Sequence, residues 1–251
     1  MALLELRKII KKFGGLTALS EIELDVKRGE ILGLIGPNGS GKTTTFSVIT
    51  GFIRPDSGKV VFEGKDITAL PPHVIAKLGI VRTFQLVNLF LDHTVLDNIL
   101  IGFHHLSNIN FTEALLNTCS YRNKEEKLLH KAMEILQITE LDSQKNKPAK
   151  NLSAGWRKTL AIAIALAANP KLILLDEPVC TLSPTRVASI MNMITKVRES
   201  GVTFVVIEHN IEAIMDYCDR VVVLNSGKKI ADGLPKEMAQ NRDVIDAYLG
   251  V

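Results

Sequence analysis

The chain has 251 residues, of which 46% are hydrophobic and 23% are charged, and its net charge is +3. This length allows one large domain or two small ones with a sizeable core, and so small a charge does not demand a nucleic-acid partner. The three cysteines form no C-x-x-C pair, which indicates free thiols in a reducing compartment. The first residues become charged too early for a secretory signal, and the longest apolar run, residues 160–168, is too short to cross a membrane. We therefore expect any role at a membrane to depend on a partner protein.

The first 85 residues predict mainly strands. Five strands are expected, at residues 3–10, 22–26, 30–35, 59–62 and 80–84. The second alternates apolar and polar side chains, which is typical of a half-exposed antiparallel strand, whereas the third is almost wholly apolar and predicts a buried one. Helices are expected at residues 46–50, ended by Gly51, and from Pro72 to near Gly79.

Residues 86–150 differ, because glycine becomes scarce and helical patterns dominate, notably over residues 124–138. They predict a helical insertion. Beyond it, strands are expected at residues 172–177, 202–207, 221–224 and 229–231, the last two as a hairpin. Helices are expected from an N-cap at Ser153 through Ala168, at residues 184–199, and in the tail to Val251.

A glycine-rich stretch connects the predicted strand at 30–35 to the helix that follows it. It reads Gly36-Pro37-Asn38-Gly39-Ser40-Gly41-Lys42-Thr43, continues with Thr44, and matches G-x-x-x-x-G-K-[ST] in full. Glycines let the backbone approach a phosphate, and successive N–H groups together with the helix N-terminus attract the anion. We predict that Lys42 reaches the β- and γ-phosphates and that the Thr43 hydroxyl binds Mg²⁺. An ordinary glycine-rich turn is the alternative, and the flanking strand and helix disfavour it.

Polar residues follow four apolar strands of the predicted sheet: Gly36, Gln85, Asp176 and His209. In parallel α/β sheets the ligand binds at this edge. Asp176 is therefore expected to hold Mg²⁺, and Glu177 to act as the general base on water. The alternative for this acidic pair is a cluster at a helix start.

Two of these strand-end predictions compete with simpler ones. His209 either contacts the γ-phosphate or is a buried structural histidine. Gln85 either contacts Mg²⁺ or water, or is simply solvated. Phe13 precedes the first glycine turn, and it either stacks on adenine or belongs to the core.

The stretch Asn151-Leu152-Ser153-Ala154-Gly155-Trp156 completes a resemblance that runs nearly end to end. The chain resembles the nucleotide-binding subunits of ABC transporters: residues 36–43 resemble the Walker A loop, 172–177 Walker B with its catalytic glutamate, and 152–155 the signature. Gln85 and His209 resemble the Q-loop and switch residues. Segments at 70–73, 79–85, 94–98 and 244–250 resemble the ATP-binding subunits of branched-chain amino-acid importers.

The resemblance implies an α/β fold, with a P-loop NTPase core built on a mixed sheet, an antiparallel β part and a helical subdomain. We expect one nucleotide-binding domain, with residues 1–85 and 151–251 as the ATPase core and 86–150 as the helical part. Two such subunits would enclose ATP and Mg²⁺ head to tail, each Walker site facing Ser153, Ala154 and Gly155 of the other subunit. The second subunit, identical or not, integral membrane permeases and, indirectly, a solute-binding protein are the implied partners. The implied location is the cytoplasmic face of the cell membrane.

The chain departs from the family pattern at several places. Ala154 replaces a common glycine or other residue, and residues 161–166 lack an arginine that the helix often contains. Trp156 stands where the signature usually continues with glutamine, and residues 179–184 differ from the usual loop after Walker B. We therefore hypothesise an asymmetric dimer, in which this chain's Walker motifs form a competent site and its own signature a weaker one. The bulky indole in the first helical turn is the reason.

Other classes of protein remain as alternatives. A soluble ABC ATPase acting on nucleic acid or ribosomes usually carries two cassettes or large insertions, and this chain has one cassette and no basic run. A P-loop kinase or GTPase would need an acceptor-binding lid or a guanine-reading motif such as Asn-Lys-x-Asp, and Asn146-Lys147-Pro148-Ala149 lacks the aspartate. A regulatory binder without hydrolysis is disfavoured by the retention of Glu177 and His209.

Overall fold

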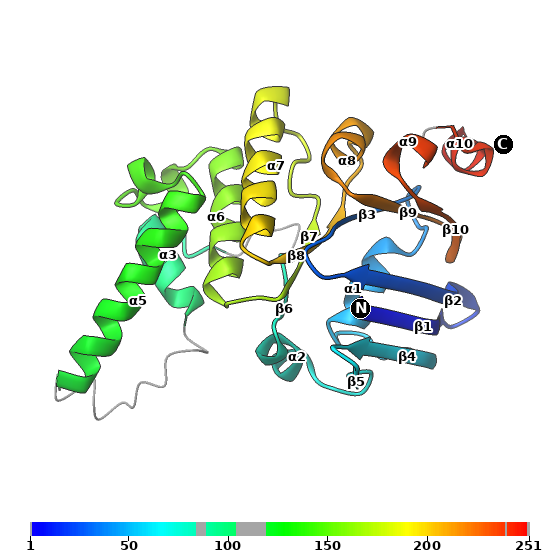
Figure 1. Ribbon diagram of the computed structural model, residues 1–251, viewed down its shortest axis with the longest axis horizontal. Coiled ribbons are helices and arrows are strands. Elements are labelled where there is room, and N and C mark those ends of the chain that lie inside the picture. The colour runs from blue at the N-terminus through cyan, green and yellow to red at the C-terminus, as the bar shows by residue number, and fades with distance from the viewer. Residues whose placement is uncertain (1, 84–88, 104–118, 239, 250–251) are drawn as a thin grey trace. The chain divides into compact units, whose positions relative to one another are not determined.

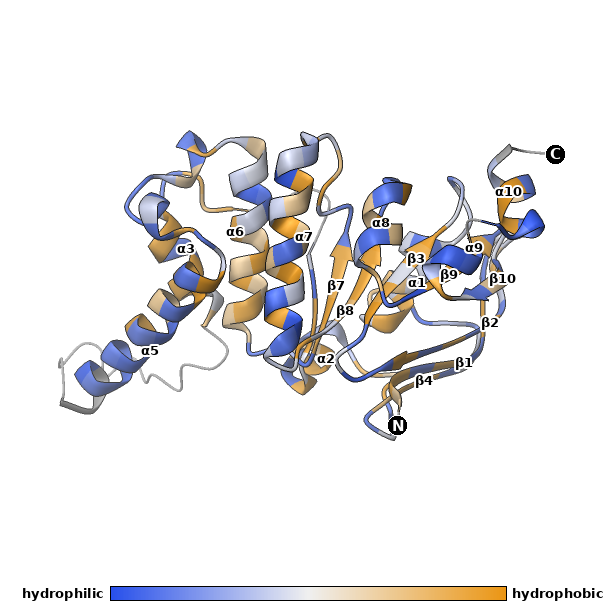
Figure 2. Cartoon of the chain, turned by 45° about the horizontal axis from the view of Figure 1, so that its top comes forward, coloured by the Kyte–Doolittle hydropathy of each residue, from blue (hydrophilic) through white to orange (hydrophobic). Residues whose placement is uncertain are grey.

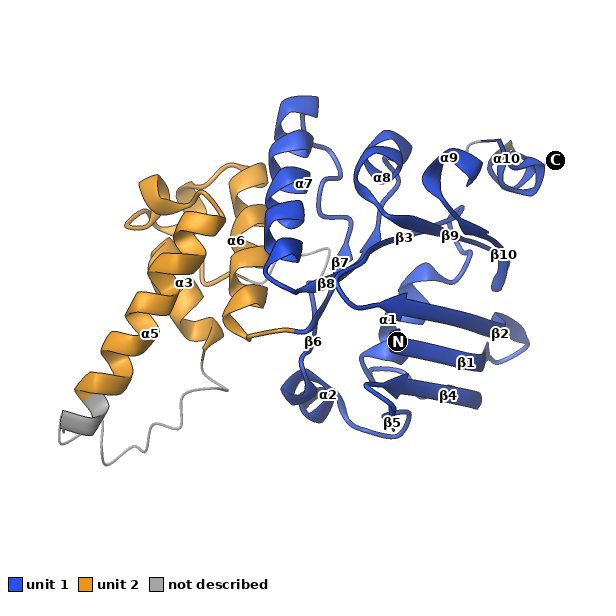
Figure 3. Cartoon of the chain, viewed as in Figure 1, with its two compact units in different colours: residues 1–85, 171–251 blue, residues 86–170 orange. Residues whose placement is uncertain are grey.

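The computed structural model describes residues 2–83, 89–103, 119–238 and 240–249 (Figure 1). The chain forms two compact units, residues 1–85 with 171–251 and residues 86–170 (Figure 3). We expected residues 151–170 in the ATPase core, but they belong to the helical unit. The reason is that helix α6 (Ala154–Ala167) shares its apolar core with the other helices of that unit.

The larger unit contains an antiparallel sheet of four strands, in the order β2-β1-β4-β5. Its strands are β1 (Ala2–Phe13), β2 (Leu16–Lys27), β4 (Ser57–Phe62) and β5 (Lys65–Asp66). The predicted strands at 3–10, 22–26 and 59–62 are confirmed, and the first two are longer than predicted. They extend because Gly14 and Gly15 make a tight turn that keeps Phe13 paired with Leu16.

The second sheet has six strands, in the order β10-β9-β3-β8-β7-β6. They are β3 (Ile31–Ile35), β6 (Ile80–Arg82), β7 (Leu172–Asp176), β8 (Thr203–Ile207), β9 (Arg220–Asn225) and β10 (Lys228–Gly233). All pairings are parallel except that of β9 with β10, which confirms the predicted hairpin. β3, β7 and β8 are buried along their whole length, as their apolar sequences predict. Figure 2 shows β7 and β8 as hydrophobic strands.

The helices of the larger unit follow the strands. They are α1 (Lys42–Ile49), α2 (Pro72–Leu78), α7 (Pro184–Glu199), α8 (Ile211–Tyr217), α9 (Pro235–Met238) and α10 (Arg242–Leu249). The helix predicted at 184–199 is confirmed, whereas α8 was not predicted. Asn210 caps α8, since its side chain accepts a hydrogen bond from the Ala213 N–H group. The tail predicted as helical contains two short helices, and residues 250–251 lie outside the described part.

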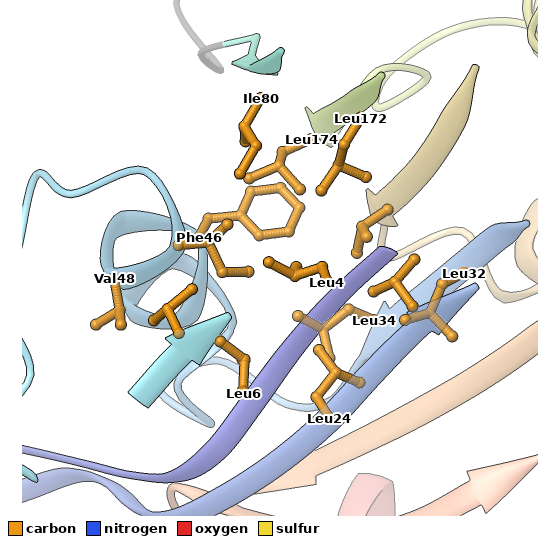
Figure 4. Close-up of a cluster of buried hydrophobic side chains, with 14 of the residues drawn as sticks. Leu4, Leu6, Leu24, Leu32, Leu34, Phe46, Val48, Ile80, Leu172 and Leu174 are labelled. Carbon is orange, nitrogen blue, oxygen red and sulfur yellow. The ribbon is translucent and has the colours of Figure 1, made fainter. Parts of the chain in front are cut away.

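The two sheets of the larger unit share one apolar core around α1. The Phe46 ring is fully buried and lies among Leu4 of β1, Leu34 of β3 and Leu174 of β7 (Figure 4). This packing fixes α1 against the strand that precedes it, and the loop between them is therefore held at both ends.

The smaller unit is helical and has its own core. It contains α3 (Val95–Gly102), α5 (Cys119–Ile138), two 3-10 turns at Asp142–Gln144 and Ala149–Asn151, and α6. Thr94 and Asp97 form a capping box that begins α3. The helix predicted at 124–138 lies within α5. Within the described ranges, no helix is both long and apolar enough to cross a lipid bilayer.

Candidate nucleotide-binding site

The loop from Gly36 to Gly41 leaves β3 and enters α1, as the sequence predicts. Gly36 has a φ of 148°, and a Cβ atom there would lie 2.0 Å from the Leu224 carbonyl oxygen. Gly41 has a φ of 105°, and a Cβ atom there would lie 2.7 Å from Leu19 Cδ2. Only glycine fits these two positions, so the strands behind the loop impose its path. Asn38 and Gly39 at the tip are exposed.

Lys42 points back into this loop. Its ammonium group donates to the carbonyl oxygens of Gly36 at 2.7 Å and Pro37 at 3.0 Å, and the residue is 6% exposed. Burial lowers the pKa of Lys42, and the negative charges of Glu177 and Asp176 partly oppose this effect. The ammonium group therefore lies in the field of both acids.

The N-terminus of α1 presents donors to the loop. Gly41 is the N-cap and supplies no side-chain cap, and the first turn holds no acidic residue. The N–H groups of the first turn of α1 and the helix dipole together favour binding of an anion. Thr43 is exposed and Thr44 half-buried, so both hydroxyls are near the surface. The Ser40 hydroxyl is buried and has no hydrogen-bond partner among the described residues.

Asp176 ends β7 and Glu177 follows it, at the edge where the loop begins. Asp176 is 8% exposed, and its Oδ2 accepts a hydrogen bond from Nη2 of Arg82 at 2.8 Å. Glu177 has a φ of 51°, a conformation that costs about 1 kcal/mol or more in an L-residue and gathers at functional sites. Its N–H group donates to the Ile207 carbonyl, which ties it to the end of β8.

His209 follows β8 and meets Glu177. Nε2 of His209 lies 3.2 Å from Oε1 of Glu177, with the side chains 43% and 16% exposed. The buried-histidine alternative is wrong because this imidazole reaches the surface. The structure thus brings the phosphate loop, Lys42, Asp176, Glu177 and His209 to one edge of the sheet, as the strand ends predict.

Sequence reasoning missed Glu208, which precedes His209 and is 1% exposed. Its Oε1 accepts the Val179 N–H group at 2.6 Å, and its Oε2 accepts the His209 N–H group at 3.2 Å. One carboxylate therefore holds the two segments that carry Glu177 and His209. A charged residue directly after an apolar strand was the available signal.

Gln85, the remaining predicted residue at a strand end, lies outside the described residues. Phe13 is 47% exposed at the end of β1, and the Lys11 ammonium lies 5.4 Å from its ring centroid. The core alternative for Phe13 is therefore wrong. Its strand pairs with β2, whose Leu19 borders the loop at Gly41, and the contact with adenine stays a prediction.

The predicted signature residues lie in the smaller unit. Ser153 occupies the N-cap position of α6 as predicted, but its side chain makes no capping hydrogen bond. Ser153 and Ala154 are exposed and Gly155 is buried. Trp156 is half-buried and packs against the core of the unit, so its indole has a structural function there. The exposed hydroxyl and helix N-terminus could bind an anion.

The donors at the sheet edge fit Mg²⁺ bound together with phosphate. The described residues contain no cluster of three or more histidine, cysteine, aspartate or glutamate side chains that could hold a metal alone. Mg²⁺ commonly takes one or two protein oxygens and completes its shell with phosphate and water. Thr43 and Asp176 supply such oxygens.

Comparisons with known proteins agree with this geometry. The family model described as ABC transporter matches residues 19–180, and one described as branched-chain amino acid ATP-binding cassette transporter matches residues 228–251. The high-affinity branched-chain amino acid transport ATP-binding protein of Pseudomonas aeruginosa is 38% identical over 249 residues, covering 99% of this chain and 98% of that protein. A probable branched-chain amino acid transport ATP-binding protein of Archaeoglobus fulgidus is 38% identical over 252 residues, covering 100% and 96%. A solved ATP-binding cassette of an ABC transporter in its ADP conformation has a TM-score of 0.88 at 36% identity, covering 100% of both chains, which confirms the predicted fold class.

Proposed function

Because the chain belongs to the ATP-binding cassette family of ABC transporters, we propose that it is the ATP-hydrolysing subunit of a membrane importer for branched-chain or related amino acids. The observation that carries the proposal is the convergence of Lys42, Asp176 and Glu177 beside a loop built to take phosphate. The match of the C-terminal segment to the branched-chain amino acid family supports the substrate class.

Each group has a role in this proposal. The amides of residues 36–44 and the Lys42 ammonium bind the triphosphate, and Phe13 stacks on adenine. Thr43, Gln85 and Asp176 would hold Mg²⁺, which would neutralise charge on the phosphates when bound. Glu177 orients water and accepts its proton, while His209 contacts the γ-phosphate.

The assembly is part of the proposal. A second cassette, identical or different, completes each site with its signature, while Ser153, Ala154 and Gly155 of this chain serve the opposite site. Closure on ATP and opening after hydrolysis would drive the integral membrane permeases at the cytoplasmic face, and the permeases would receive solute from a binding protein. We keep the hypothesis that Trp156 makes this chain's signature the weaker one.

The test is purification from detergent-solubilised membranes, followed by reconstitution. We expect the tagged chain to co-purify with an integral membrane subunit, and the reconstituted complex to take up leucine, isoleucine or valine in an ATP-dependent manner. Failure of uptake by a complex that hydrolyses ATP would contradict the substrate class. Co-sedimentation with ribosomes instead of membrane subunits would favour the alternative of a soluble ABC ATPase.

A further inference from the structure

Arg82 lies at the end of β6, within the segment 79–85 that supports the family resemblance, but the sequence predicts no role of its own for this residue. Its Nη2 donates to Oδ2 of Asp176 at 2.8 Å, and its Nη1 donates to the Ser47 hydroxyl at 3.1 Å. The guanidinium also lies 5.6 Å from the centroid of the Phe46 ring. Three contacts, one with β7 and two with α1, therefore hold this side chain in one orientation.

The Arg82–Asp176 pair is buried, because both side chains are only 8% exposed. A buried ion pair contributes little net stability compared with apolar residues, but removing one partner leaves the other charge uncompensated. Arg82 occupies Oδ2, and Oδ1 of Asp176 accepts no hydrogen bond within the described residues. The guanidinium thus directs the carboxylate and leaves one oxygen for another ligand.

The contact with Ser47 extends this arrangement to the phosphate loop. The Ser47 hydroxyl donates to the carbonyl oxygen of Thr43 at 2.8 Å. A continuous set of hydrogen bonds therefore runs from Asp176 through Arg82 and Ser47 to Thr43. Its two ends are the residues predicted to supply oxygens to Mg²⁺, one on β7 and one on α1.

We propose that Arg82 is a positioning residue of the nucleotide site, which sets the spacing and orientation of Thr43 and Asp176 for the Mg²⁺ that accompanies the nucleotide. This inference rests on the proposed function. Partners that orient metal ligands typically change metal affinity by about 10–100-fold when they are replaced. Lysine cannot reproduce the two-point contact of a guanidinium, although it keeps the charge.

The experiment is a Mg²⁺ titration of fluorescent ATP-analogue binding to the full chain, with parallel binding in EDTA. For Arg82→Lys, we expect about a tenfold rise in the Mg²⁺ concentration that gives half of the maximal effect on ATP-analogue binding. The affinity for the analogue in EDTA should stay unchanged. Ser47→Ala removes the link to Thr43 and keeps the ion pair, and it should shift the titration in the same direction. Arg28→Lys is the matched control, because Arg28 forms an exposed ion pair with Glu63.

The outcomes separate this inference from the proposed function. If Arg82→Lys and Ser47→Ala bind with the wild-type Mg²⁺ dependence, Arg82 is a structural ion-pair partner only and the inference is wrong. A lowered melting temperature without a shifted titration leads to the same conclusion. If Arg82→Lys does not fold, the Ser47→Ala titration decides. If the wild-type chain binds no nucleotide with or without Mg²⁺, the proposed function and this inference both fail.

Discussion

Nε2 of His209 lies 3.2 Å from Oε1 of Glu177 across 32 residues of sequence. The parallel register of β7 and β8, in which Asp176 pairs with Ile207, brings the two strand ends side by side. The Glu177 N–H group also donates a hydrogen bond to the Ile207 carbonyl oxygen. A backbone contact and a side-chain contact therefore both connect the end of β7 to the end of β8. The proposed base and the proposed contact for the γ-phosphate therefore occupy one corner of the site.

Glu177→Gln should abolish most ATP hydrolysis and preserve nucleotide binding. The substitution keeps the size of the side chain and removes the carboxylate that accepts a proton, and such groups contribute about 10²–10⁴-fold. Steady-state turnover together with nucleotide titration measures both effects. Glu212→Gln, on the exposed face of α8, is the control. Unchanged turnover in Glu177→Gln would refute the assignment of the base.

Glu208→Gln should lower the rate of ATP turnover, although Glu208 has no proposed contact with the reacting groups. Both carboxylate oxygens accept backbone N–H groups, and the amide nitrogen of glutamine would instead meet a donor. We expect a loss of about 1–3 kcal/mol in the free energy of unfolding, as for a buried donor left unpaired. Urea unfolding measures the change in the free energy of unfolding. The kcat of the variant, divided by the kcat of the wild type, tests whether Glu208 positions Glu177 and His209. Wild-type kcat in a destabilised variant would limit Glu208 to a structural role.

Gly36→Ala and Gly39→Ala should differ sharply. At Gly36 the new Cβ atom would lie 2.0 Å from a backbone carbonyl oxygen, so the loop or β9 must move. At Gly39 no atom would lie within 4 Å of the added Cβ atom. Gly39→Ala should therefore lower the free energy of unfolding by about 1 kcal/mol, because alanine disfavours the backbone φ of 80° at this position. Unfolding and nucleotide titrations should therefore show a larger loss for Gly36→Ala. Equal losses would mean that the loop path is not imposed by the strands behind it.

Trp156→Gln should affect both stability and turnover. Because the half-buried indole packs on the core of the helical unit, its loss should lower the free energy of unfolding by about 1–3 kcal/mol. If Trp156 weakens the signature, turnover of the assembled dimer should rise despite this loss. Turnover equal to that of wild type would remove the main support for the asymmetric dimer.

Cys218 and Cys180 should differ in reactivity. Burial raises the pKa of the Cys218 thiol to about 12, so it stays protonated near pH 8.5, where an exposed thiol is about half ionised. Cys180 is half-buried on the loop after β7. In a Cys119→Ser background, mass spectrometry after brief iodoacetamide treatment of the folded protein should find label on Cys180 and little on Cys218. Equal labelling would contradict the burial of Cys218.

Local patterns predicted most of the elements and the core of the site. The complete glycine-rich motif, the apolar runs before Asp176 and His209, and Ser183-Pro184 at the start of α7 each carry their signal within a few residues. Parallel pairing then brings the strand ends together, which is why the phosphate loop and the acids could be placed without coordinates.

The rest depends on contacts between distant segments. Arg82 and Asp176 are 94 residues apart in sequence, and nothing in a three-residue strand indicates that its arginine is an internal ion-pair partner. Likewise, α6 follows the predicted helical insertion in sequence, and its packing with α3 and α5 assigns it to that unit. Ser153 looked like a helix cap, yet its hydroxyl makes no capping bond.

Isothermal titration calorimetry of ATP into the wild-type chain and Lys42→Ala, with Mg²⁺ present, tests the central claim most directly. The Lys42 ammonium lies in the loop at Gly36 and Pro37 and within the field of both acids. We expect one ATP per wild-type chain and at least a tenfold weaker affinity in Lys42→Ala, since the lost group pairs with phosphate charge (about 1.4 kcal/mol or more). Absence of heat with folded wild-type protein, or equal affinity in both proteins, would contradict a triphosphate site at this loop.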